Sequence, residues 1–246
     1  MPKQRVVLVT GGSRGIGAAT ARQAARRGFA VAVNFKSDEK AAQGVVKAIE
    51  TGGGKAVAIR GDMASESDIA RTFEVVDREL GRLTDLVYNS GITGKASRFE
   101  AVSTATLREV VDVNVMGAFL CVRAAIPRIS TRQGGAGGSI VLLSSVAANL
   151  GGVGEYVWYA ASKGAIDTLT IGLSRELAAD GIRVNAVSPG PVDTDIHEPG
   201  RLDRIVPMVP MGRAATADEI AETILFLMSD ASAYTTGANM RIAGGR

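Results

Sequence analysis

One cysteine, Cys121, and one histidine, His197, are all that this chain of 246 residues contains of either type. A single thiol excludes an internal disulfide and every metal site built on several thiolates, and it favours a reducing compartment. With a single imidazole, a Ser-His-Asp triad would have to use His197, and a zinc site would lack its usual nitrogen ligands. We therefore predict a cytoplasmic protein with no metal site and neither of these chemistries.

Aromatic residues and one-sided charge are also scarce. Aromatics make up 4% of the chain, and 28 Lys and Arg residues against 25 Asp and Glu give a formal net charge of only +3. Few rings are available to stack nucleobases, and the cations are scattered, so we expect no nucleic-acid partner. The apolar run in MPKQRVVLVTGG is too short for a signal-peptide core or a membrane span, so no membrane association is expected.

Short β-branched runs alternate with longer segments of helical apolar spacing along the whole chain. This alternation predicts the α/β class, with a doubly wound, seven-stranded parallel sheet and helices on both faces. No linker composition interrupts residues 1–246, so one domain is expected. Strands are expected at 5–10, 30–34, 55–60, 85–88, 139–144, 182–188 and 238–242, and helices at 15–27, 38–51, 66–79, 104–130, 156–179 and 217–228. The segment 189–210 contains five prolines and is predicted to be a long loop with at most a short helix, typical of an active-site lid.

The first expected strand runs directly into TGGSRGIG, in which Gly11, Gly15 and Gly17 form the pattern T-G-x-x-x-G-x-G. Glycines let the backbone approach a pyrophosphate closely, and the following helix offers unpaired N–H groups and partial positive charge. The pattern predicts a dinucleotide site. A glycine-rich turn without a ligand is the alternative.

Four polar residues follow in a recognisable order. Tyr159 and Lys163 are four residues apart on one face of an expected helix, Ser145 lies fourteen residues before Tyr159, and Asn114 lies in the preceding long helix. With the glycine turn, this order resembles the short-chain dehydrogenase/reductase family, in particular its bacterial glucose/ribitol-dehydrogenase-like and 3-oxoacyl-reductase-like members. The resemblance spans essentially the whole chain and implies a Rossmann fold.

The resemblance implies an NADP(H)-dependent oxidoreductase that interconverts a carbonyl and a secondary alcohol by hydride transfer. Tyr159 would be the general acid and base, and Ser145 would hydrogen-bond the substrate oxygen. Lys163 would bind the nicotinamide ribose and lower the pKa of Tyr159, while Asn114 would anchor a water between Lys163 and solvent. Ser144 and Tyr156 are neighbouring residues of the same types that do not fit the pattern.

The resemblance also implies a set of cofactor contacts. They comprise the glycine turn (Gly11, Ser13, Arg14, Gly15, Ile16, Gly17), an adenine-binding acid and its neighbour (Asp62, Met63), the Y-N-S-G motif (Asn89, Gly91), the nicotinamide segment (Pro189, Gly190, Val192, Thr194), and Tyr159 and Lys163. A turn or helix-capping role is the alternative for Asp62. The Y-N-S-G motif departs from the family's N-N-A-G because Tyr88 and Ser90 replace Asn and Ala, which questions a hydrogen bond that normally stabilises the central sheet.

The end of the second expected strand predicts which nicotinamide cofactor is bound. NAD-specific sites place a carboxylate there for the ribose hydroxyls, whereas a phosphate requires cations. Asn34 and Lys36 occupy this position, and Arg14 can reach the same corner. We predict NADP(H), with NAD(H) as the alternative, since Asp38 and Glu39 follow closely.

Two other functions remain open from the sequence: a non-catalytic NADP(H)-sensing protein and, ranked last, a sugar epimerase or dehydratase. The resemblance implies a homotetramer in which helices 104–130 and 156–179 meet their symmetry mates. The expected partner is a small carbonyl or alcohol substrate whose identity the sequence leaves open. Candidate substrate contacts are Arg98, Glu155, His197 and Arg201, with a solvated surface position as the alternative for each.

Overall fold

The computed structural model describes residues 4–246 and contains one seven-stranded parallel sheet. The strands are β1 (Val6–Val9), β2 (Ala30–Phe35), β3 (Ala56–Arg60), β4 (Asp85–Tyr88), β5 (Gly138–Leu143), β6 (Ile182–Pro189) and β7 (Asn239–Ile242). Their order is β3-β2-β1-β4-β5-β6-β7, so the chain winds outward from β1 in one direction and then from β4 in the other. The predicted doubly wound Rossmann sheet is confirmed. That residues 1–246 form one domain stays a prediction.

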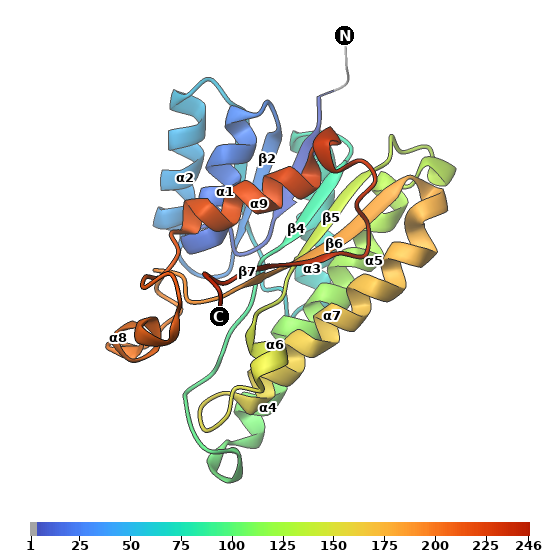
Figure 1. Ribbon diagram of the computed structural model, residues 1–246. Helices are drawn as coiled ribbons and strands as arrows, with labels where there is room; N and C mark the ends of the chain where they lie inside the picture. The colour runs from blue at the N-terminus through green and yellow to red at the C-terminus, as the bar shows by residue number, and fades with distance from the viewer. Residues whose placement is uncertain (1–3) are drawn as a thin grey trace.

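Helices cover both faces of the sheet (Figure 1). One face carries α1 (Gly15–Arg26), α2 (Glu39–Thr51) and α9 (Ala217–Met228), and the other carries α3 (Glu66–Glu79), α5 (Gly117–Ile129) and α7 (Val157–Leu177). The helix expected at 104–130 is α4 (Thr104–Val111) and α5 joined by a π-helical turn, Asp112–Met116. Two short helices were not placed by the sequence: α6 (Ala147–Leu150), and α8 (Arg201–Ile205) inside the predicted lid.

Side-chain alternation along the strands explains why helices are needed on both faces. In β1, Val6 and Leu8 belong to one hydrophobic core, while Val7 and Val9 belong to the other. All four residues are buried. A strand that buries both of its faces needs a continuous apolar run, and this one has it in VVLV.

The stretch Thr104–Ile129 is long and apolar enough, by length and composition, to cross a membrane. Within it, α5 buries Ala118, Cys121 and Val122 in the core beneath the sheet. Packing against the sheet therefore accounts for the apolar character of this face of α5.

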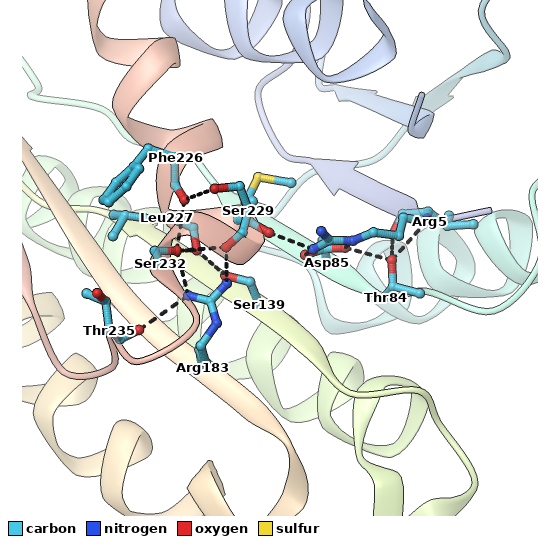
Figure 2. Close-up of polar contacts among 12 residues, drawn as sticks. Arg5, Thr84, Asp85, Ser139, Arg183, Phe226, Leu227, Ser229, Ser232 and Thr235 are labelled. Carbon is cyan, nitrogen blue, oxygen red and sulfur yellow. Dashed lines mark hydrogen bonds and ion pairs between the residues drawn. The ribbon is translucent and has the colours of Figure 1, made fainter. Parts of the chain in front are cut away.

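A polar network connects the amino ends of four strands to the end of α9 (Figure 2). The Asp85 carboxylate, fully buried, accepts hydrogen bonds from Arg5 Nε at 3.0 Å and Thr84 Oγ1 at 2.7 Å. Arg5 also donates to the Met228 carbonyl at 2.8 Å, and Arg183 donates to Ser232 Oγ at 3.1 Å. The arginines thus occupy the carbonyl end of α9, where cations are favoured.

Candidate active site

A cleft of about 1000 Å³ opens at the carboxyl ends of the strands, above the point between β1 and β4 where the strand order reverses. Such switch points are where open α/β sheets bind their ligands. The glycine turn, the ends of β4 and β5, and the segment after β6 all line this cleft. The sequence-predicted motifs, far apart in the chain, therefore meet at one place.

The glycine turn is built to bring backbone to a ligand. Gly11 and Gly15 have φ of +60° and +53°, which glycine adopts without strain. A Cβ on Gly17 would lie 2.3 Å from the Gly11 carbonyl oxygen. No side chain caps the start of α1, whereas Asp38, Ser65, Ser103 and Thr216 cap α2, α3, α4 and α9. The free N–H groups of α1 suit a pyrophosphate, and Ser13 and Ile16 line the cleft beside them.

Asn89, after β4, holds the glycine turn in place. Its side-chain amide donates to the carbonyl oxygens of Thr10 and Gly11, each at 3.0 Å. Gly91 leaves room for the catalytic centre, since a Cβ there would lie 3.3 Å from Lys163 Nζ. Asn89 thus fixes the backbone of the glycine turn, and Gly91 leaves space beside Lys163.

The nicotinamide segment follows β6. Pro189 ends this strand, and Gly190 and Val192 line the cleft. The Thr194 side chain lies against the glycine turn, with its methyl 3.2 Å from where a Cβ of Gly15 would be. The two predicted cofactor segments are therefore in contact.

Ser145, Tyr159 and Lys163 come together on the floor of the cleft. Tyr159 and Lys163 lie on α7, and the Ser145 hydroxyl, just past β5, is close enough to Tyr159 to oppose the rise in its pKa. Lys163 is buried, its Nζ donates to the Leu143 carbonyl at 2.6 Å, and it lies 5.7 Å from the centre of the Tyr159 ring. The sequence order Ser, Tyr, Lys thus becomes a spatial cluster.

Burial shifts the pKa values of this cluster. It raises the pKa of Tyr159, while the Ser145 hydrogen bond and the Arg201 charge oppose that rise. That Lys163 lowers the pKa of Tyr159 stays a prediction. Burial itself lowers the pKa of Lys163 to about 8. The loss of hydration destabilises the charged ammonium more than the nearby Asp167 carboxylate stabilises it.

Asn114 lies in the π-helical turn between α4 and α5 and is fully buried. Its Oδ1 accepts from the Ile92 amide at 2.9 Å, and its Nδ2 donates to the Ile92 carbonyl and to Ser162 Oγ, both at 2.9 Å. Ser162 precedes Lys163 on α7. Asn114 therefore connects the loop after β4 to the catalytic helix.

The two neighbouring residues of the same types have other contacts. Ser144 is buried and donates to the Lys163 carbonyl at 3.2 Å. Tyr156 is the residue before α7, and its ring lies 5.0 Å from the guanidinium of Arg201. Ser144 and Tyr156 therefore do not take the places of Ser145 and Tyr159.

Tyr88 replaces the first Asn of the family motif and makes a different bond. It is buried in β4, and its hydroxyl donates to the Val113 carbonyl in the π-helical turn. Burial raises the pKa of Tyr88 well above its usual value, so the hydroxyl stays a donor. Gly117 makes room, since a Cβ there would lie 2.3 Å from this hydroxyl. Tyr88 therefore links β4 to the π-helical turn that carries Asn114, in place of the hydrogen bond expected from the family's usual Asn.

Replacing Tyr88 with Phe removes this donor, so the Val113 carbonyl loses its buried side-chain partner. We expect the free energy of unfolding to fall by about 1 to 3 kcal/mol, measured by urea denaturation followed by circular dichroism. Tyr234→Phe is the matched control, because Tyr234 is fully exposed and should give an unchanged midpoint. Equal midpoints for the two variants would contradict a stabilising role for the Tyr88 hydroxyl.

At the adenine end, Lys36 Nζ lies 2.8 Å from the Asp62 carboxylate, which also accepts from the Ala64 amide at 3.0 Å. The turn role considered for Asp62 is therefore present. Asn34 Oδ1 accepts from the Gly11 amide at 3.3 Å and its Nδ2 donates to the Gly61 carbonyl at 3.0 Å, so it holds two loops together. The Met63 side chain is buried in the core.

Three of the four predicted substrate contacts line the cleft. His197 and Arg201 come from the lid and Glu155 from the turn before α7, whereas Arg98 does not line the cleft and pairs with Glu100. Arg204 also lines the cleft and was missed, because no motif or spacing distinguishes it in the sequence.

Known proteins resemble this chain over nearly its whole length. The family described as enoyl-(acyl carrier protein) reductase matches residues 11–246. The uncharacterized oxidoreductase YgfF of Escherichia coli (strain K12) is 47% identical over 245 residues, covering 98% of this chain and 99% of that protein. The 3-oxoacyl-acyl-carrier-protein reductase FabG of Staphylococcus aureus (strain Mu50) is 34% identical, covering 100% and 99%.

Two solved structures have the same fold. A short-chain dehydrogenase/reductase from Serratia marcescens has a TM-score of 0.93 at 33% identity, covering 100% of this chain and 99% of that one. A blue fluorescent protein from a metagenomic library, solved in complex with NADPH, has a TM-score of 0.92 at 33% identity, covering 98% and 97%. The fold and the cleft are those of an NAD(P)-dependent dehydrogenase or reductase. The chain belongs to the short-chain dehydrogenase/reductase family.

Proposed function

We propose that this protein interconverts a carbonyl and a secondary alcohol with NADP(H), using Tyr159 as general acid and base. The observation that carries the proposal is the cluster of Tyr159, Ser145 and Lys163 on the floor of the cleft. When bound, NADP(H) supplies the hydride to the carbonyl carbon or accepts it in the reverse direction.

Each side chain of the cluster has its own role in proton transfer. Ser145 donates a hydrogen bond to the substrate oxygen, and Tyr159 protonates that oxygen during reduction or removes its proton during oxidation. Lys163, with a pKa of about 8, can exchange a proton near neutral pH and resupply Tyr159. Asn114 holds the loop beside them and anchors the water that leads to solvent.

The test is consumption of NADPH by the purified protein in the presence of a panel of aldehydes and ketones. Turnover of any carbonyl, with the alcohol as product, supports the proposal. Binding of NADPH without turnover of the whole panel would favour the sensing function instead.

The residues of the cleft fit NADP(H) as the cofactor. The glycine turn leaves no room for a Cβ at Gly17, the start of α1 has free N–H groups, and the exposed Lys36 extends at the end of β2. The Asp62 hydrogen bond raises the pKa of Lys36, which keeps it cationic. Lys36 and Arg14 would hold the ribose phosphate, which NAD(H) lacks. The adenine role of Asp62 remains part of this proposal.

Replacing Lys36 with Ala should weaken NADPH binding by about 10-fold, because one charge-assisted bond to the phosphate is lost. NADH binding should be nearly unchanged. Fluorescence titration with both nucleotides measures the difference. Lys40→Ala on α2 is the matched control, since Lys40 is exposed and outside the cleft. Equal weakening of NADH and NADPH would contradict the phosphate contact.

We also propose the homotetramer. Val111, Met116 and Phe119 on the α4–α5 segment and Ile171 on α7 are exposed large apolar side chains on the two helical segments expected to pair. Burying them against symmetry mates would remove apolar surface from water. A cytoplasmic location stays a proposal that rests on the single cysteine.

A further inference from the structure

Beyond Tyr159, the cleft contains a cluster of charged side chains. The Glu155 carboxylate accepts from Arg201 Nε at 3.1 Å and from Arg204 at 3.0 Å, so two guanidinium groups share one carboxylate. The Glu198 carboxylate is also near, since its charge helps to raise the pKa of Tyr156. Asp195 and Arg246 also line the cleft, with opposite charges that offset each other.

Arg201 is the member held in a fixed position. Its side chain is only 20% exposed, and its guanidinium lies over the Tyr156 ring at 5.0 Å. One terminal nitrogen lies 2.9 Å from His197 Nδ1. Burial and the Arg201 charge lower the pKa of His197, so the neutral ring can accept this bond. The other terminal nitrogen lies 3.1 Å from the Glu155 carboxylate. Each of the three guanidinium nitrogens thus has one partner, and of the five N–H groups two remain available to a ligand.

The walls around this cluster are apolar. Leu150, Val153, Ile196 and Met208 line the cleft and are 44%, 83%, 45% and 54% exposed. Large apolar side chains left open at the mouth of a cleft suit an apolar ligand surface. The Arg201 charge is also close enough to oppose the rise in the Tyr159 pKa. The cation and the reacting hydroxyl therefore belong to one pocket.

We propose that the substrate combines an apolar body with a carboxylate, which binds Arg201 while its carbonyl or alcohol group lies at Tyr159. A cationic substrate would meet two guanidinium groups, and Glu155 is already engaged by both. The planar guanidinium matches a carboxylate through two parallel hydrogen bonds. This inference rests on the proposed oxidoreductase function.

The experiment compares acids with their methyl esters, which share the body and the ketone but lack the charge. NADPH-dependent reduction of 3- and 4-acetylbenzoate and of the two esters is measured with the wild type, Arg201→Gln and Arg213→Gln. The wild type should prefer an acid over its ester. Arg201→Gln should lower kcat/KM for that acid by about 10- to 100-fold, mainly through KM, because a charged hydrogen bond is lost. The ester should lose several-fold less than the acid, because it lacks the charge that Arg201 binds, so the preference for the acid falls.

Arg213→Gln is the matched control because Arg213 pairs with Glu219 outside the cleft, and it should keep the acid preference. NADPH titration checks that each variant keeps its fold. A wild type that prefers the esters, or an Arg201→Gln that loses acid and ester equally, would overturn the inference while turnover of the esters upholds the oxidoreductase. Turnover of neither acids nor esters nor any other carbonyl of the panel would overturn both.

Discussion

Replacing Tyr159 with Phe is expected to lower kcat/KM for any carbonyl substrate by about 1000-fold, in the range typical of a lost general acid. The Tyr159 phenol combines a transferable proton with a nearby Ser145 hydroxyl and a nearby lysine. Phe keeps the ring, which packs against Val110 and Trp158. The loss should therefore fall on the proton transfer and leave the fold intact.

Initial rates of NADPH oxidation measure this effect, and fluorescence titration should give an NADPH affinity close to that of the wild type. Tyr234→Phe is the matched control for removing a phenol hydroxyl, since Tyr234 lies on the surface outside the cleft. A Tyr159→Phe protein that retained most of its activity would assign the proton to another group.

Replacing Asp85 with Ala is expected to lower the free energy of unfolding by about 3 kcal/mol, the lower end of the cost of breaking a buried ion pair from one side. Asp85 is fully buried and pairs with Arg5, and burial raises its pKa despite that pairing. Its removal leaves Arg5 and the Thr84 hydroxyl without their shared acceptor. The joint between β1, β4 and the end of α9 is weakened (Figure 2).

Thermal unfolding should show the midpoint lower by roughly 6 to 12 °C for a chain of this size. Glu100→Ala is the control, because it breaks an exposed ion pair with Arg98 and should leave the midpoint unchanged. Activity at low temperature should persist in Asp85→Ala, since Asp85 begins β4 and the cleft lies at the opposite ends of the strands. An unchanged midpoint would mean that the network does not stabilise the fold.

Much of the site could be predicted from the sequence because its chemistry depends on local backbone conformation and short-range spacing. The turn at Gly11 to Gly17 needs glycines at fixed spacing, and Tyr159 and Lys163 share a helix face because they are four residues apart. Buried parallel strands need apolar β-branched runs, so their positions could be read within a few residues. Local spacing was enough for each of these features.

Other features could not be read because they depend on contacts between distant segments. The sequence marked Tyr88 as a departure, but only the fold brings its hydroxyl to the Val113 carbonyl. Burial, which the sequence does not give, is the largest influence on the pKa values of both Tyr159 and Lys163. The π-helical turn at Asn114 was likewise not visible in the helical spacing.

The sequence by itself determined the alternation of strands and helices, the glycine turn and the order of Asn, Ser, Tyr and Lys, because each follows from residue type and short-range spacing. Only the tertiary structure decided what surrounds them. It brought Glu155 against Arg201 and Arg204, 46 and 49 residues further along, in a cleft that exposed apolar side chains also line. Charge balance in a cleft depends on which distant side chains meet and how much water they exclude, and neither is encoded in local sequence.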